Sequence, residues 1–191
     1  MIGGTSPLLL GLLSMVIWFY LDKLESRVII YLAAGLILGL IIDLIFLKGW
    51  INRRFELPLW SLAAIYILYN IFVFGFFMGF PVFNVLLGLI AGNYFGNRIV
   101  SSKLPSEKQS KQTKQVSTFT ALIMALICVS SAVIGLTDEY TGANIQGMLS
   151  LDFEVTQPML WAIALVGGLS MITVQYVITG WAIRKTIGLK L

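Results

Sequence analysis

The chain has 191 residues, of which 58% are hydrophobic and only 12% carry a charge. A soluble domain has about 25% charged residues, so this composition predicts an all-α integral membrane protein, a polytopic bundle of helices. The absence of histidine excludes haem ligation by imidazole, histidine-based metal sites and catalytic sets that need histidine. The single Cys128 excludes an intramolecular disulfide and a cysteine metal cluster. We therefore expect no catalytic residue, no metal and no cofactor.

Six apolar runs are each close to the ~20 residues that cross the hydrocarbon core of a bilayer. In chain order they predict transmembrane helices over 3–21, 28–47, 58–78, 81–97, 117–136 and 158–183. The first run has no basic region before it and no small-residue cleavage pattern after it, so we interpret it as a retained span and not as a signal peptide.

The third and fourth spans are separated by a turn that the length of the apolar stretch requires. Residues 58–97 contain no charge, and a single helix of that length would be about 60 Å long, roughly twice the hydrocarbon core. Gly79 tolerates turn conformations, and Pro81 starts a helix well because its missing N–H would be unpaired there. The sequence therefore predicts an antiparallel hairpin that turns at Gly79-Phe80-Pro81.

The basic residues fall at the ends of alternate spans, which predicts the orientation of the chain. With both termini in the cytoplasm, 11 of the 13 lysines and arginines lie inside, and only Lys23 and Arg27 lie outside. The net charge of +4 is explained by this asymmetry, so we expect no nucleic-acid partner. We expect the localisation to be a prokaryotic cytoplasmic membrane.

The connections between spans divide the chain into two transmembrane parts, residues 1–97 with four helices and residues 117–191 with two. Between them, residues 98–116 are polar and basic and predict a flexible cytoplasmic linker held near anionic lipid by its lysines. A docking site for a cytoplasmic partner is the alternative for this linker. Residues 137–157 form an acidic outer loop with four carboxylates, and its apolar residues favour a short interfacial helix.

Two spans carry small residues at four-residue spacing, which lets helix backbones approach closely. The rows are Gly35 and Gly39 in the second span and Gly88, Gly92 and Gly96 in the fourth. Because both spans run inward and the rows lie at matching depths, we expect the spans to pack as parallel neighbours, Gly35 near Gly88 and Gly39 near Gly92. The alternative is that each row meets a different helix, or makes room for lipid or ligand.

Asp43 is the one acidic residue inside a predicted span. A carboxylate in the apolar layer is costly and usually has a partner or a function. It lies five residues from Lys48 near the inner boundary, where Arg53 or Arg98 is also within reach, so a structural ion pair is the leading interpretation. Handling of an ion or a proton is the alternative.

The other polar residues inside the spans are neutral, and some of them are candidates for binding a ligand. Asn70, Asn84 and Tyr69 are expected in the outer half of the bilayer, where Trp161 would add a stacking surface. Together they predict a pocket for a neutral or zwitterionic small molecule under the 137–157 loop. The alternative is that these groups only form hydrogen bonds between helices, at about 0.6 kcal/mol each.

Two classes of function remain after these exclusions, and neither is enzymatic. The first is a solute-handling protein, either a small permease or the substrate-capturing subunit of a transporter. The second is a non-catalytic structural, assembly or regulatory subunit of a membrane complex. The expected partners are the lipid bilayer, a small-molecule ligand, and other membrane subunits or further copies of the chain.

The expected size, six spans and cytoplasmic termini are similar to those of the S-components of energy-coupling-factor vitamin transporters. The resemblance covers overall architecture and includes no sequence motif. It implies a ligand pocket near the outer face, capped by a loop such as 137–157.

Overall fold

The computed structural model describes residues 5–21, 28–52, 55–77 and 79–189. These residues form α-helices joined by short 3₁₀ and π segments, and no strand occurs in the described ranges. The prediction of an all-helical protein is therefore confirmed. The chain divides into two compact units, Met1–Ile65 and Tyr66–Leu191, called unit 1 and unit 2 below.

Among the described residues, four helical stretches are long and apolar enough to cross a membrane: Val28–Ile45, Leu59–Phe76, Ser106–Thr137 and Gln157–Gly188. A further apolar helix, Ser6–Tyr20, is shorter. Large apolar side chains face outward along these stretches, as on the fifth predicted span, where Leu122, Leu126, Val129 and Val133 are all more than half exposed. Their spacing places them on one face of the helix, as expected of a surface that faces lipid. These features are those of an integral membrane protein.

Unit 1 contains a pair of antiparallel helices, α1 (Thr5–Leu21) and α2 (Val28–Asn52). A Cβ added at Gly35 would meet Leu10 and Ser14, whereas one added at Gly39 would meet Pro7 and Ser6. As the residue number on α2 increases from 35 to 39, the residue numbers of the neighbours on α1 decrease. The two helices therefore run in opposite directions. The glycines let the two backbones approach closely.

The predicted hairpin turn is confirmed. Helix α3 (Leu59–Phe76) is followed by a turn at Gly79, a 3₁₀ segment η2 (Pro81–Asn84) and α4 (Val85–Ser101). Gly79 has φ of +84°, which a residue without a Cβ adopts at little cost, and Pro81 begins η2. The turn is also joined to α5 (Ser106–Thr137), whose Ser131 hydroxyl donates to the Gly79 carbonyl at 2.7 Å.

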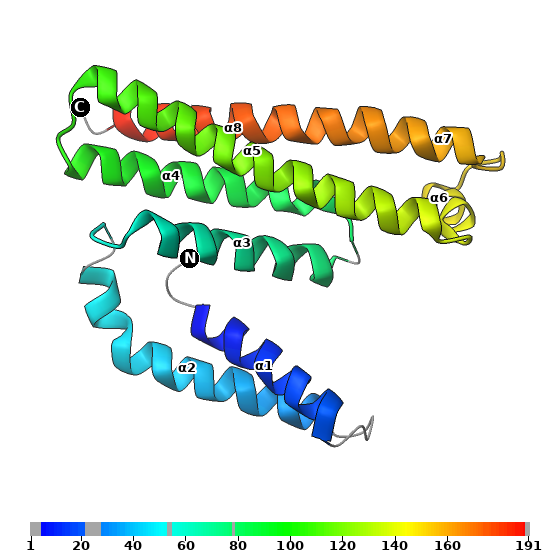
Figure 1. Cartoon of the computed structure of the whole chain (residues 1–191), viewed down its shortest axis with the longest axis horizontal. Coiled ribbons are helices and arrows are strands. Elements are labelled where there is room, and N and C mark those ends of the chain that lie inside the picture. Colours follow the sequence, from blue (N-terminus) through cyan, green and yellow to red (C-terminus); the bar gives the residue numbers. More distant parts are fainter. Residues whose placement is uncertain (1–4, 22–27, 53–54, 78, 190–191) are drawn as a thin grey trace. The chain divides into compact units, whose positions relative to one another are not determined.

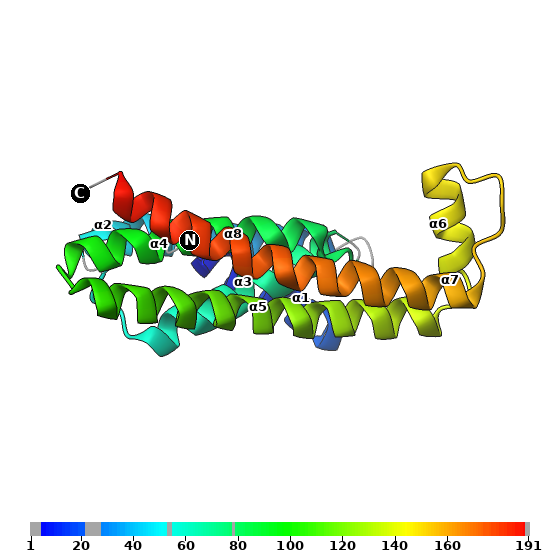
Figure 2. The same cartoon turned by 90° about the horizontal axis from the view of Figure 1, so that it is seen from above.

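Unit 2 is built around three long helices, α4, α5 (Ser106–Thr137) and α8 (Gly168–Gly188), which lie side by side (Figures 1 and 2). Gly88 lies against Gln175 and Thr179, and Gly96 against Ile183 and Thr186, so the residue numbers rise together and α4 is parallel to α8. Helix α5 runs in the opposite direction.

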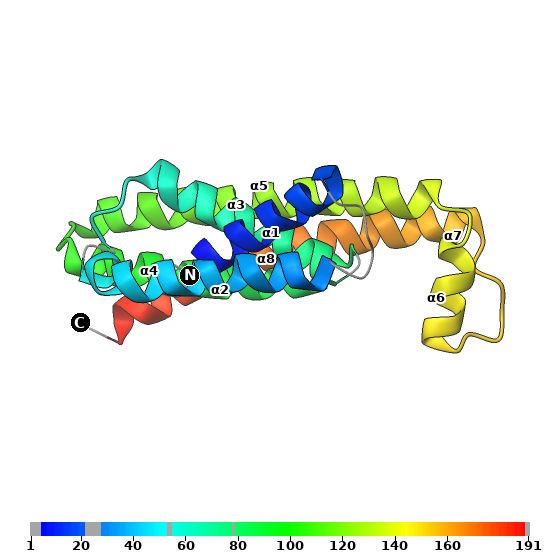
Figure 3. The same ribbon diagram turned by 90° about the horizontal axis from the view of Figure 1, so that it is seen from below.

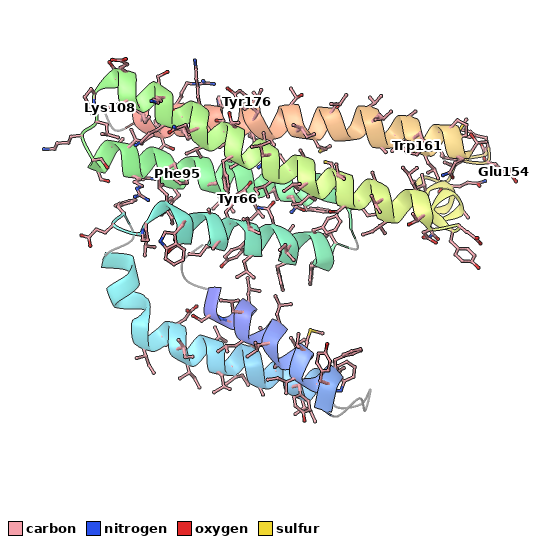
Figure 4. The ribbon with its side chains drawn as sticks, viewed as in Figure 1. Tyr66, Phe95, Lys108, Glu154, Trp161 and Tyr176 are labelled. Atoms are coloured by element: carbon pink, nitrogen blue, oxygen red, sulfur yellow. The ribbon has the colours of Figure 1, made fainter. Side chains whose placement is uncertain are left out.

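The parallel arrangement brings the basic ends of α4 and α8 to the same end of unit 2. Arg98 lies in the last turn of α4 and Lys185 in the last turn of α8. The acidic segment between α5 and α7 (Gln157–Ala162) lies at the other end, where Figure 4 labels Glu154. Charge is therefore segregated along unit 2.

The acidic segment contains the short helix α6 (Thr141–Leu149), which confirms that a helix forms in this loop. It stands crosswise to α5 and α7 at one end of unit 2 and projects away from them (Figures 2 and 3). From α7 the chain continues through a π segment, η3 (Ile163–Gly167), into α8. The sixth predicted span is thus one helical stretch that contains a π turn.

The compact units meet at residues 65 and 66, within the predicted third span. The expected division at residues 98–116 refers to membrane spans, and it stays a prediction. Helix α4 continues to Ser101 and α5 already begins at Ser106. Most of the predicted flexible linker is therefore helical, because its lysines, glutamines and Glu107 are good helix formers.

Candidate functional site

A group of buried, neutral polar side chains lies inside unit 2 and is contributed by α3, η2, α5 and α8. Each of its members is at most 4% exposed. We call this group the polar cluster; it consists of Tyr66, Asn70, Asn84, Ser117, Thr120, Gln175 and Thr179. Figure 4 shows Tyr66 at about the middle of the length of unit 2. The cluster therefore lies between the basic and the acidic ends of the unit.

One side of the polar cluster joins the two arms of the hairpin. The Asn84 amide nitrogen donates to the Asn70 carbonyl at 2.8 Å and lies 3.1 Å from the Asn70 side-chain oxygen. The Asn70 amide nitrogen in turn donates to the Tyr66 carbonyl at 2.9 Å, one turn earlier on α3. These bonds hold Asn84 at the start of α4, where its side chain is fully buried.

Gln175 connects this side of the polar cluster to α8. Its amide nitrogen donates to the Tyr66 hydroxyl at 2.8 Å. Gly88 of α4 leaves the room that the Gln175 side chain occupies, because an added Cβ would come within 2.8 Å of Gln175 Cδ and of Thr179 Oγ1. Tyr66 also packs against Phe119 of α5, with ring centroids 5.9 Å apart.

The remaining members of the polar cluster join α5 to α8. The Thr120 hydroxyl lies 3.0 Å from the Thr179 hydroxyl and 3.0 Å from the Ser117 carbonyl. Ser117 faces Gly180, whose added Cβ would lie 3.1 Å from the Ser117 hydroxyl. The hydroxyls of three residues thus line the contact between the two helices.

Three side-chain oxygens of the polar cluster are buried and have no hydrogen-bond partner among the described residues: Asn84 Oδ1, Gln175 Oε1 and Ser117 Oγ. Exchanging the positions of the Gln175 amide oxygen and nitrogen would still leave one buried polar atom without a partner. The Tyr66 hydroxyl both donates and accepts, so the other end of the amide would then be left unpaired. A buried polar group without a partner costs about 1–3 kcal/mol, so such groups are uncommon and need an explanation.

The polar cluster is uncharged. Among the buried residues described in unit 2, none carries a charge. A guanidinium nevertheless lies beside it, since an added Cβ at Gly180 would be 3.1 Å from the Ser117 hydroxyl and 3.7 Å from an Arg184 nitrogen. The Ser117 side of the cluster is therefore next to a cation. Arg98 Nη1, also in unit 2, is buried without a hydrogen-bond partner among the described residues.

The four residues predicted to form a ligand pocket are only partly brought together. Asn70 and Asn84 are in direct contact, and Tyr69 is half-buried on α3. Trp161 is 53% exposed, and Figure 4 shows it on α7 near Glu154, well separated from Tyr66 along the unit. A groove of 370 Å³ lies on α8 along Leu169, Ser170, Thr173 and Val174, and contains none of the four.

Each glycine row meets a helix of its own unit, so the predicted pairing of the second and fourth spans is wrong. Gly35 and Gly39 of α2 meet α1. Gly88, Gly92 and Gly96 of α4 meet α8. Four-residue spacing determines which face of a helix admits a close neighbour, but it does not determine which helix that neighbour is. The alternative, a different partner for each row, is the arrangement observed.

Asp43 lies on α2 in unit 1 and is 6% exposed. Arg53 and the side chain of Lys48, which we considered as its ionic partners, lie outside the described part of the structure. The ion pair therefore stays a prediction.

Several members of the polar cluster were not singled out from the sequence. Ser117 and Thr120 lie three residues apart on α5, and Gln175 and Thr179 lie four apart on α8, so each pair shares a helix face. The four-residue spacing of Asn84 and Gly88 continues the same pattern on the neighbouring helix. A search for polar residues at helical spacing in two spans would have found this face.

Comparisons with family models, with curated proteins and with solved structures find no match to this chain. Within the described ranges, no group of three or more histidine, cysteine, aspartate or glutamate side chains is arranged to hold a metal ion. What the site can do chemically therefore has to be argued from the polar cluster itself. It offers neutral hydrogen-bond donors and acceptors in an apolar surrounding.

Proposed function

We propose that this chain is a solute-handling membrane protein, either a small permease or the substrate-capturing subunit of a transporter for a small neutral or zwitterionic molecule. One observation carries the proposal, namely the three buried side-chain oxygens of the polar cluster that have no donor among the described residues. Polar groups whose only role is to join helices gain by being paired. Unpaired acceptors in the interior are instead suited to a partner that arrives and leaves.

The proposal includes six membrane spans with both termini in the cytoplasm of a prokaryotic cell. The four long apolar helices and the shorter Ser6–Tyr20 helix support it. Together, η2 and α4 cover Pro81–Ser101, a stretch of sufficient length to serve as the sixth. The basic ends of α4 and α8 lie at one end of unit 2, which supports the positive-inside orientation.

The proposal assigns no enzymatic activity to the chain. It lacks histidine, and its one cysteine is buried in α5, so the common nucleophile–base pairs have no candidate. We also assign no nucleic-acid partner, and lipid is the expected surrounding of the exposed apolar faces.

The competing function is that of a non-catalytic structural, assembly or regulatory subunit. Its main support in the sequence was the pair of glycine rows, which are typical of contacts between membrane helices. Each row is occupied by a helix of its own unit, α1 in unit 1 and α8 in unit 2. These surfaces are therefore not left open for another subunit, which favours solute handling.

Native mass spectrometry of the gently purified full-length protein tests the proposal. We expect a small molecule to stay bound to the wild type and to be lost from an Asn84→Leu variant, which removes one of the unpaired oxygens. Thr173→Val is the matched control, because Thr173 lies exposed on α8. Retention of another protein subunit, with no small molecule, would favour the competing function.

A further inference from the structure

Hydrogen-bond donors gather around Gly180, on the side of the α5–α8 contact that faces the basic end of unit 2. An added Cβ at Gly180 would lie 3.1 Å from the Ser117 hydroxyl and 3.7 and 3.8 Å from the two terminal nitrogens of Arg184. All three groups can donate hydrogen bonds. We propose that they bind a phosphate group, which an anionic phospholipid supplies from the leaflet at the basic end.

Neither residue of this phosphate site has a partner among the described residues. Ser117 is 2% exposed, and its hydroxyl oxygen takes part in no hydrogen bond. The Arg184 side chain forms no hydrogen bond or ion pair there either. A buried hydroxyl without a partner is costly, and a phosphate oxygen that accepts its hydrogen removes that cost.

The charges on the two helices attract an anion to the phosphate site. Lys185 follows Arg184 on α8, and Lys114 lies one turn before Ser117 on α5; both lysines are exposed. Helix α8 has no acidic residue, and the one in α5 is Glu107, ten residues before Ser117 and about 15 Å away along the helix. No neighbouring carboxylate on these helices therefore competes for the guanidinium, whose planar fork suits a phosphate.

The position of the site along α8 indicates a lipid as the source of the phosphate. Trp181 is 47% exposed, and the Lys185 ammonium lies over its ring, 4.7 Å from the ring centroid. Tryptophan and lysine are typical of the level where headgroups meet hydrocarbon. Farther toward the middle of α8, Val174 and Val177 are exposed and offer an apolar surface to acyl chains.

Binding at this place needs no closed cavity. Arg184 is exposed, so a headgroup reaches its guanidinium from outside the bundle. Gly180 has no side chain to fill the space between the guanidinium and the Ser117 hydroxyl. A small movement of the long Arg184 side chain lets one phosphate oxygen pair with the guanidinium and another accept from the hydroxyl.

Native mass spectrometry of the full-length protein in micelles tests the phosphate site. Phosphatidylglycerol and phosphatidylcholine are added in equal amounts, because both contain a phosphate but only the first has a net negative charge. We expect the phosphatidylglycerol adduct to be about tenfold more abundant. A parallel sample receives inorganic phosphate in place of lipid, and we expect no adduct there.

Variants separate the site from general attraction by the basic end. Arg184→Gln is expected to lower the phosphatidylglycerol adduct about tenfold, and Ser117→Ala about fivefold. Arg184→Lys keeps the charge without the planar fork, so its loss should be smaller. Lys108→Gln removes one charge at the basic end, where Figure 4 labels Lys108, and should leave the adduct unchanged.

Stability gives a second measurement for Ser117. Because its hydroxyl has no partner, Ser117→Ala should not lower the thermal unfolding midpoint of the lipid-free protein. A lowered midpoint would show that the hydroxyl has a structural partner, and would overturn its role in the phosphate site. Helix content and a monodisperse elution profile qualify each variant for comparison.

The outcomes distinguish the site, its occupant and the proposed function. Equal retention of the two lipids, or equal losses in Arg184→Gln and Lys108→Gln, would overturn the phosphate site. An inorganic phosphate adduct that needs Arg184 and Ser117, without a preference between the lipids, would keep the site but overturn the lipid as its occupant. None of these results depends on whether the chain handles a solute, because Asn84 and Gln175 take no part in the phosphate site.

Discussion

The two glycine rows of this protein look alike in the sequence but are used in different ways. In unit 1, Gly35 and Gly39 of α2 face mostly the backbone of an antiparallel helix, with Leu10 and Pro7 as their nearest neighbours. In unit 2, Gly88 of α4 faces the side chains of Gln175 and Thr179 on a parallel helix. The first row is lined mainly by backbone, with the Ser14 hydroxyl at Gly35. The second row changes along its length, from the polar side chains at Gly88 to the Thr179 carbonyl at Gly92.

This comparison shows that a row of small residues indicates where a helix leaves space, and that it does not indicate what the space is used for. Where the neighbour offers only backbone and apolar atoms, the space gained becomes tight packing. Where the neighbour carries an amide or a hydroxyl, the same space lets a polar group reach the interior. The following substitutions test this distinction, in order of decreasing effect.

The largest effect is expected for Gly39→Ala in unit 1. The added methyl group would overlap the backbone of Pro7 and Ser6, which cannot move aside without separating the helices. We expect the free energy of unfolding to fall by about 3 kcal/mol, at the upper end of the range for overpacked sites. Unfolding of the full-length protein in mixed micelles, followed by circular dichroism, measures this change.

Gly11→Ala on α1 is the matched control for this substitution. Its methyl group would approach the end of the Leu36 side chain at 3.2 Å, and a flexible side chain can yield. A loss for Gly39→Ala no larger than that for Gly11→Ala would contradict the close backbone contact.

The second effect concerns Gly92 of α4. An added Cβ would lie 2.7 Å from the Thr179 carbonyl oxygen and 2.7 Å from the Ala182 Cβ, so part of the obstacle is again backbone. We expect Gly92→Ala to lower the free energy of unfolding by about 2 kcal/mol in the same assay. Gly75→Ala on α3, which has open space around it, should cost nothing. Equal stabilities of these two variants would show that α4 and α8 do not pack as described.

A smaller loss of stability is expected for Gly88→Ala, four residues earlier. Here the neighbours are side-chain atoms, Gln175 Cδ and Thr179 Oγ1, which can rotate away. We expect a loss of about 1 kcal/mol, less than for Gly92→Ala. A Gly88→Ala variant that is less stable than Gly92→Ala would mean that the two glycines are used in the same way.

The fold was predictable from the sequence where local chemistry and length act together. The Gly79-Phe80-Pro81 turn followed because an apolar stretch of that length must reverse and because these residues suit a reversal. Residues 106–116 were misjudged because polarity was taken as a sign of flexibility, although Lys, Gln and Glu also favour helices.

The candidate site was predictable only in part. Asn70 and Asn84 were expected together in the outer half of the bilayer, on the two arms of the hairpin, but their direct contact was not predicted. Gln175 reaches them from a helix about ninety residues later, and no feature of the sequence states that α4 and α8 are neighbours. The contact between distant helices is set by the packing of whole surfaces, which a pattern within one span does not encode.

The smallest effect is expected for the hydrogen bond between Thr120 and Thr179, which joins α5 to α8 at 3.0 Å. Both hydroxyls are paired, unlike the oxygens of Asn84 and Gln175, so this bond serves as the purely structural part of the polar cluster. A double-mutant cycle with Thr120→Val and Thr179→Val should give a coupling of about 0.6 kcal/mol, the mean for such bonds in a membrane protein. A coupling indistinguishable from zero would contradict the hydrogen bond between the two hydroxyls.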